Sequence, residues 1–132
     1  MTTTTAALAV DDDHTIRRLI VRLLQRAGFD PVDSAADGAV ALEKMRDTHY
    51  LLVVLDLRMP RVSGYDVLAD LARNPLPNMP KIIVVTADRQ ASTQPLDSEV
   101  VTAMLAKPFE VETFISTVQS CLPEDATGAD ER

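Results

Sequence analysis

The chain has 132 residues, of which 46% are hydrophobic and 25% are charged, as expected for one globular domain with its own core. The net charge of -7 argues against a nucleic-acid-binding surface, because contacts with phosphates require clustered Lys and Arg. The single cysteine, the lack of a signal peptide in residues 1–5 and the lack of a membrane-spanning stretch predict a cytoplasmic protein with no membrane contact.

Strands and helices alternate from residue 6 onward. Residues 6–10 predict a short apolar strand that ends in three aspartates. In residues 16–27, apolar side chains recur at helical spacing, which predicts an amphipathic helix. Asp13 is placed to cap the start of this helix, and Gly28 is placed to end it.

The middle of the chain repeats the alternation. Residues 31–35 predict a second strand, and the less regular helix after it ends near Asp47. Residues 51–55 form an unbroken apolar run, which is typical of a parallel strand covered on both faces. Asp56 directly follows this run, and a proline shortly afterwards requires the strand to end. A third helix is expected to begin near Gly64, where glycine would free the backbone φ angle.

The last third of the chain completes the pattern. Residues 81–86 and 102–106 predict two more strands, and residues 111–122 predict a final amphipathic helix. Residues 88–100 are polar and interrupted by a proline, so a helix there is expected to be short or atypical. The acidic tail, residues 123–132, is predicted to be disordered. The alternation predicts an α/β fold, with helices on both faces of a doubly wound, five-stranded parallel sheet.

Four predicted strands end in functional groups: Asp11 and Asp12, Asp56, Thr86 and Lys107. They should meet, because the carboxyl ends of parallel strands lie at one edge of a sheet. Carboxylates gathered there repel each other, by about 4 kcal/mol for two charges about 4 Å apart at an effective dielectric constant of about 20. Mg²⁺, which prefers oxygen ligands, would relieve this repulsion. A carboxylate nucleophile, a hard metal, an ammonium and a hydroxyl suit phosphoryl transfer.

The sequence resembles the receiver domain of two-component response regulators over roughly residues 6–122. The motifs that carry the resemblance are Val10-Asp11-Asp12, Asp56-Leu57-Arg58-Met59-Pro60 with Gly64, Val85-Thr86-Ala87 and Lys107-Pro108-Phe109. The resemblance implies a flavodoxin-like fold with strand order 2-1-3-4-5 and a cis peptide bond between Lys107 and Pro108. It further implies that the protein is a phosphoacceptor switch and catalyses only its own phosphorylation and dephosphorylation.

The resemblance also implies a role for each site residue. Asp56 would accept a phosphoryl group from a histidine kinase or phosphotransfer protein, and Thr86 and Lys107 would bind the phosphoryl oxygens. The implied Mg²⁺ ligands are Asp12, Asp56 and the backbone carbonyl of Arg58, with Asp11 acting through water. The phosphorylated, stand-alone domain would then signal to a downstream protein by direct contact.

Two other functions stay open. A degenerate receiver would bind partners without being phosphorylated, and a Mg²⁺-dependent phosphatase would use Asp56 as its nucleophile on an external substrate. The phosphatase would need an acid/base carboxylate just after the nucleophile, but position 58 is arginine. Many receivers carry an aromatic residue at the position of Met104, so we hypothesise that phosphorylation shifts residues 88–100 instead of turning an aromatic ring.

The remaining notable side chains are predicted to have structural roles. The expected core residues are Met104, Phe109 and Phe114. The expected solvent-exposed histidines are His14 and His49, and Cys121 is expected to lie inert on a helix face.

Overall fold

The computed structural model describes residues 5–88 and 100–121. Every strand and helix predicted within these ranges is present. In chain order they are β1 (Ala7–Val10), α1 (His14–Arg26), β2 (Val32–Ala35), α2 (Gly38–Asp47), β3 (Leu52–Leu55), α3 (Gly64–Arg73), β4 (Lys81–Thr86), β5 (Ala103–Ala106) and α4 (Val111–Ser120). The predicted atypical helix and the acidic tail lie outside the described residues, apart from the ends of the former.

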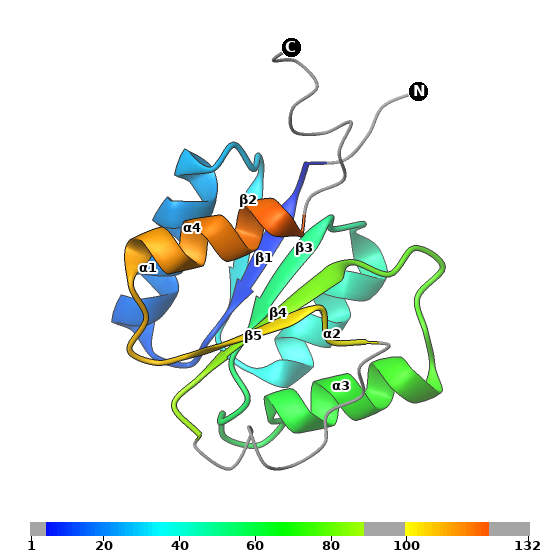
Figure 1. Cartoon of the computed structure of the whole chain (residues 1–132). Helices are drawn as coiled ribbons and strands as arrows, with labels where there is room; N and C mark the ends of the chain where they lie inside the picture. The colour runs from blue at the N-terminus through cyan, green and yellow to red at the C-terminus, as the bar shows by residue number, and fades with distance from the viewer. Residues whose placement is uncertain (1–4, 89–99, 122–132) are drawn as a thin grey trace.

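The five strands form one parallel sheet in the order β2-β1-β3-β4-β5, as predicted (Figure 1). The register aligns Val10 with Leu55, so the next residues, Asp11 and Asp56, leave the sheet at the same level. Thr86 is aligned with Ala106, and Lys107 follows directly. The carboxyl edge of the sheet therefore collects all the predicted functional groups.

The sheet separates two hydrophobic cores. Helices α1 and α4 cover one face, and α2 and α3 cover the other (Figure 1). Along β3, Val53 and Leu55 belong to the core under α2 and α3, whereas Leu52 and Val54 belong to the core under α1 and α4. Burial on both faces explains why this strand is an unbroken apolar run. No helix in the described part of the chain is both long and apolar enough to cross a membrane.

Two helix ends behave as the sequence predicts. The Asp13 side chain accepts a hydrogen bond from the backbone N–H of Ile16, which caps α1. Gly28, just beyond α1, has a φ of 105°, a conformation that favours glycine. Gly64 is required at the start of α3 for a different reason from the one predicted. Its φ is not positive, and a Cβ atom there would lie 2.2 Å from the backbone oxygen of Asp56.

One core prediction is wrong. Met104 is 40% exposed, because β5 is an edge strand on which exposed and half-buried residues alternate. Phe114 is buried as predicted, and half-buried Phe109 stacks against it with ring centroids 5.2 Å apart. The Lys107–Pro108 peptide bond is cis as the resemblance implied, and the Asp30–Pro31 bond is also cis, which the sequence reasoning missed.

Candidate functional site

Asp56 lies at the centre of the carboxyl edge of the sheet. Its backbone N–H donates to the carbonyl of Val10 at 3.0 Å, which continues the pairing of β3 with β1. The residue is 5% exposed, so its carboxylate is almost fully removed from bulk water. Burial, together with the nearby charge of Asp11, raises the pKa of Asp56 despite the opposing effect of Lys107.

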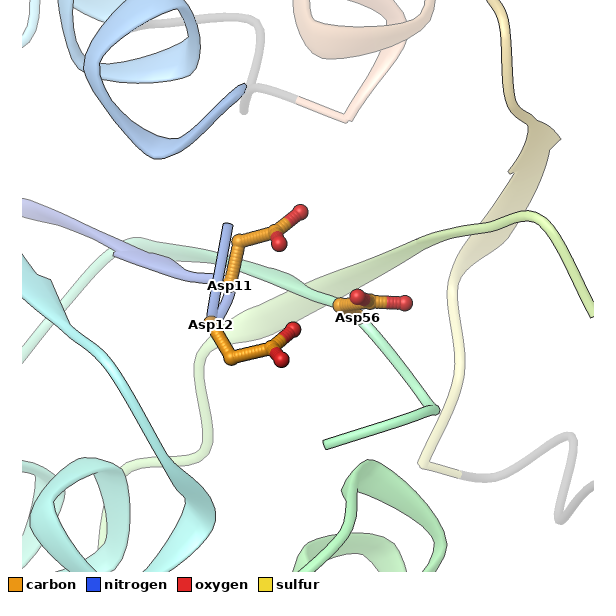
Figure 2. Close-up of side chains that lie close together, drawn as sticks. All are labelled: Asp11, Asp12 and Asp56. Carbon is orange, nitrogen blue, oxygen red and sulfur yellow. The ribbon is translucent and has the colours of Figure 1, made fainter. Parts of the chain in front are cut away.

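Asp11 and Asp12 bring two more carboxylates to Asp56. Figure 2 shows the three side chains, which leave the ends of β1 and β3 and extend to the same side. One oxygen from each carboxylate lies within 4.8 Å of the other two. Asp11 is buried and Asp12 is exposed. Three close carboxylates with no nitrogen or sulfur donor among them are suited to a hard divalent cation such as Mg²⁺.

Lys107 reaches the same cluster from the end of β5. Its backbone N–H donates to the carbonyl of Thr86 at 2.9 Å, and its Nζ donates to Asp11 Oδ2 at 2.7 Å and to Asp56 Oδ2 at 3.2 Å. Burial disfavours the charged ammonium, but the hydrogen bond that Lys107 donates to Asp11 and the charges of both carboxylates outweigh this effect and raise the pKa of Lys107. The lysine is therefore a fixed positive charge beside Asp56.

The clustered groups face an open cavity of about 640 Å³. Its lining residues are Asp11, Asp12, Asp13, Asp56, Arg58, Ala87, Asp88 and Lys107. The cavity contains every predicted site residue except Thr86. The Thr86 side chain is buried, and its Oγ1 accepts a hydrogen bond from the backbone N–H of Asp88 at 3.1 Å. Thr86 thus lies at the predicted edge, with its hydroxyl bonded within its own loop.

Sequence reasoning missed one residue of the site, Asp88. Its side chain is 5% exposed, and its Oδ2 accepts hydrogen bonds from the Tyr65 hydroxyl at 2.6 Å and from Arg58 Nε at 3.2 Å. The only signal in the sequence was an aspartate placed two residues after a strand that ends in a functional hydroxyl. The Arg58 side chain consequently points to Asp88 and is 70% exposed.

The chain is similar to known proteins over most of its length. The family model described as response regulator receiver domain matches residues 7–119. Protein PilG of Pseudomonas aeruginosa is 32% identical over 120 residues, covering 88% of this chain and 86% of PilG. A protein-glutamate methylesterase/protein-glutamine glutaminase of Halobacterium salinarum is 32% identical over 97% of this chain, which spans only 36% of that enzyme.

A solved structure supports the same relationship. The response regulator protein TrrA from Thermotoga maritima, in complex with Mg(2+)-BeF, has a TM-score of 0.78 and 32% identity, and the match covers 89% of this chain and 98% of TrrA. The matched motifs, the sheet order and the clustered carboxylates therefore agree in one conclusion. The chain belongs to the response regulator receiver domains, the phosphoacceptor switches of two-component signalling.

Proposed function

We propose that Asp56 is the phosphoacceptor of this receiver, in a domain that spans residues 6–122. The observation that carries the proposal is the position of the buried Asp56 carboxylate. It lies at an open cavity, 3.2 Å from the Lys107 ammonium and beside two further carboxylates. In the reaction, an Asp56 oxygen forms a bond to phosphorus while the bond from phosphorus to the imidazole nitrogen of a donor's phosphohistidine breaks.

The acidic residues and Lys107 have different electrostatic roles: the former would bind the metal ion, and the latter supplies a positive charge. Asp12, Asp56 and the backbone carbonyl of Arg58 would hold Mg²⁺, with Asp11 reaching it through water. One lysine cannot neutralise three carboxylates, so the set has spare negative charge for a divalent cation. When bound, Mg²⁺ neutralises charge on the phosphoryl oxygens. Lys107 adds a second positive charge that is already in contact with Asp56.

Thr86 would complete the site as a donor to a phosphoryl oxygen. Its hydroxyl proton is available for this, because Oγ1 uses a lone pair to accept from Asp88. The phosphorylated domain then signals by contact with a downstream protein. No acid/base carboxylate follows Asp56, and Arg58 at that point binds Asp88, so we infer that the domain catalyses only its own phosphorylation and dephosphorylation.

The surface of α1 suggests the chemistry of the phosphodonor. This helix carries four arginines and no acidic residue, although the whole chain has a net charge of -7. Among the described residues, no carboxylate forms an ion pair with Arg18, Arg22 or Arg26. A hollow of about 300 Å³ is lined by residues of α1 and by Ser34 of β2. We infer that the kinase or phosphotransfer protein presents an acidic docking surface to α1.

The test is incubation with acetyl phosphate and Mg²⁺, followed by intact mass measurement. The wild type should gain the mass of one phosphoryl group, and Asp56→Asn should gain none. Asp47→Asn, at the exposed end of α2, is the matched control and should be phosphorylated like the wild type. If the wild type gains nothing, the domain is a degenerate receiver; if Asp56→Asn is phosphorylated equally, another residue is the acceptor.

A further inference from the structure

The hydroxyl of Thr86 is connected to helix α3 by a short chain of hydrogen bonds. Thr86 Oγ1 accepts from the backbone N–H of Asp88 at 3.1 Å. The carboxylate of the same Asp88 accepts from the hydroxyl of Tyr65, in the first turn of α3, at 2.6 Å. We call the contacts of Asp88 with Tyr65 and Arg58 the Asp88 clasp.

Within the clasp, Tyr65 forms the stronger contact. A hydroxyl that donates to a carboxylate at 2.6 Å has the short distance typical of charge-assisted hydrogen bonds. Arg58 approaches the carboxylate at 3.2 Å, but its side chain is 70% exposed. Water therefore weakens the attraction between the two charges and competes for the hydrogen bonds of the guanidinium group. The hydrogen bond to Asp88, together with partial burial, also raises the pKa of Tyr65, so the phenol stays protonated and able to donate at neutral pH.

The clasp opposes a shift of residues 86–88 that would bring Thr86 into the cavity. Thr86 is buried and is not among the residues that line the cavity at Asp56. For its hydroxyl to reach a phosphoryl group there while Oγ1 keeps the hydrogen bond from the backbone N–H of Asp88, residues 86–88 must shift together. Asp88 cannot follow such a shift while Tyr65 and Arg58 hold its carboxylate against the start of α3 and the loop before it.

We propose that Tyr65 is a positioning residue that acts through Asp88 and holds Thr86 outside the cavity while Asp56 is unphosphorylated. This inference rests on the proposed function. Formation of the phosphorylated state then requires the Tyr65–Asp88 hydrogen bond to break, so part of the binding free energy at Asp56 is used to open the clasp. The same event frees the Tyr65 side chain at the start of α3, so this side chain becomes available to report phosphorylation to a partner.

The chain contains a matched control for this proposal. Its only other tyrosine, Tyr50, also donates to an aspartate at 2.6 Å, but its partner is Asp33 on β2. Tyr50 precedes β3 and therefore lies at the amino edge of the sheet, away from Asp56. Tyr65→Phe and Tyr50→Phe each remove one phenol hydroxyl that is bonded to a carboxylate, and each keeps the aromatic ring.

The experiment is a titration with beryllofluoride in the presence of Mg²⁺, in which the ¹⁹F NMR signal of the bound species measures the affinity. Removing the Tyr65 hydroxyl should make beryllofluoride bind about tenfold more tightly. A change of this size corresponds to the lower end of the free-energy range for a hydrogen bond to a charged group. Tyr50→Phe should bind like the wild type, and thermal unfolding checks that both variants are folded. Equal affinity of Tyr65→Phe and the wild type, or weaker binding by Tyr65→Phe, would overturn the proposal.

A second measurement uses tyrosine fluorescence. The chain has no tryptophan and two tyrosines, so Tyr65 is the only tyrosine that emits in the Tyr50→Phe variant. A carboxylate hydrogen bond quenches tyrosine emission, so saturation with beryllofluoride and Mg²⁺ should increase the emission of Tyr65. Unchanged emission at saturation would contradict opening of the clasp. If the wild type shows no Mg²⁺-dependent bound ¹⁹F signal, the proposed function fails as well; if the signal is present, only the role of Tyr65 is at stake.

Discussion

Replacing Asp56 by asparagine should make the metal-free protein more stable. Asparagine has nearly the same shape and keeps an oxygen that can accept the hydrogen bond from Lys107. It removes a charge that is buried and surrounded mainly by charges of the same sign. The raised pKa of Asp56 has the same cause: burial and Asp11 together disfavour the ionised carboxylate more than Lys107 favours it.

The size of the effect follows from the distances in the site. At an effective dielectric constant of about 20, the ammonium of Lys107 at 3.2 Å stabilises the Asp56 charge by about 5 kcal/mol. Asp11 and Asp12, with oxygens no more than 4.8 Å away, oppose it by about 7 kcal/mol together. Screening of the exposed Asp12 reduces this excess, and desolvation of Asp56 increases it. We expect Asp56→Asn to raise the free energy of unfolding by about 1–3 kcal/mol.

The assay is urea and thermal unfolding at neutral pH with EDTA. A gain of about 1 kcal/mol corresponds to roughly 3–5 °C in Tm for a domain of this size. A carboxyl whose pKa is raised in the folded chain destabilises it above that pKa, so the difference between variant and wild type should shrink as the pH falls through the Asp56 pKa. Mg²⁺ should stabilise the wild type more than Asp56→Asn. An Asp56→Asn protein that is equally or less stable than the wild type in EDTA would refute the electrostatic account.

Three further predictions test other parts of the molecule. Gly64→Ala places a methyl group 2.2 Å from the backbone oxygen of Asp56, so it should cost about 3 kcal/mol in unfolding free energy and abolish the phosphoryl adduct in mass measurements. The double variant Arg18→Glu/Arg22→Glu should slow phosphotransfer from a phosphorylated histidine-containing protein about tenfold and leave the rate with acetyl phosphate unchanged; equal slowing of both would exclude a docking role. The pKa of Tyr50 is raised from 10.0 to about 12, chiefly by burial and by Asp33, so stability present below pH 10.0 should be lost as the pH rises through about 12. Unfolding of Tyr50→Phe over that range should show a smaller loss, by up to about 2–3 kcal/mol, and parallel curves would disprove the assignment.

The sheet and the positions of the acidic groups were predictable because each depends on a local pattern. Burial on both faces leaves continuous apolar runs in β1, β3 and β4, and the residue after each run must emerge at the carboxyl edge. Asp11 and Asp56 are therefore neighbours as soon as the strand order is known. Their contact with Lys107 depends on the same rule applied to β5.

Other features depend on contacts between distant segments, which no local pattern encodes. The Asp88 clasp joins Asp88 to Tyr65 and to Arg58, which lie 23 and 30 positions earlier in the sequence. The Oγ1 atom of Thr86 is bonded to the backbone N–H of the same Asp88. Met104 has the apolar character of a core residue, yet it lies on an edge strand and is exposed. The need for Gly64 was evident, but its cause is the close approach of α3 to the backbone of Asp56.

The central sheet also separates the two surfaces that we expect to contact partners. The arginines of α1 lie on one side of it, and the start of α3 with Tyr65 lies on the other. A phosphodonor that contacts the arginines of α1 and an effector that contacts the outer surface of α3 would therefore approach the domain from opposite faces of the sheet.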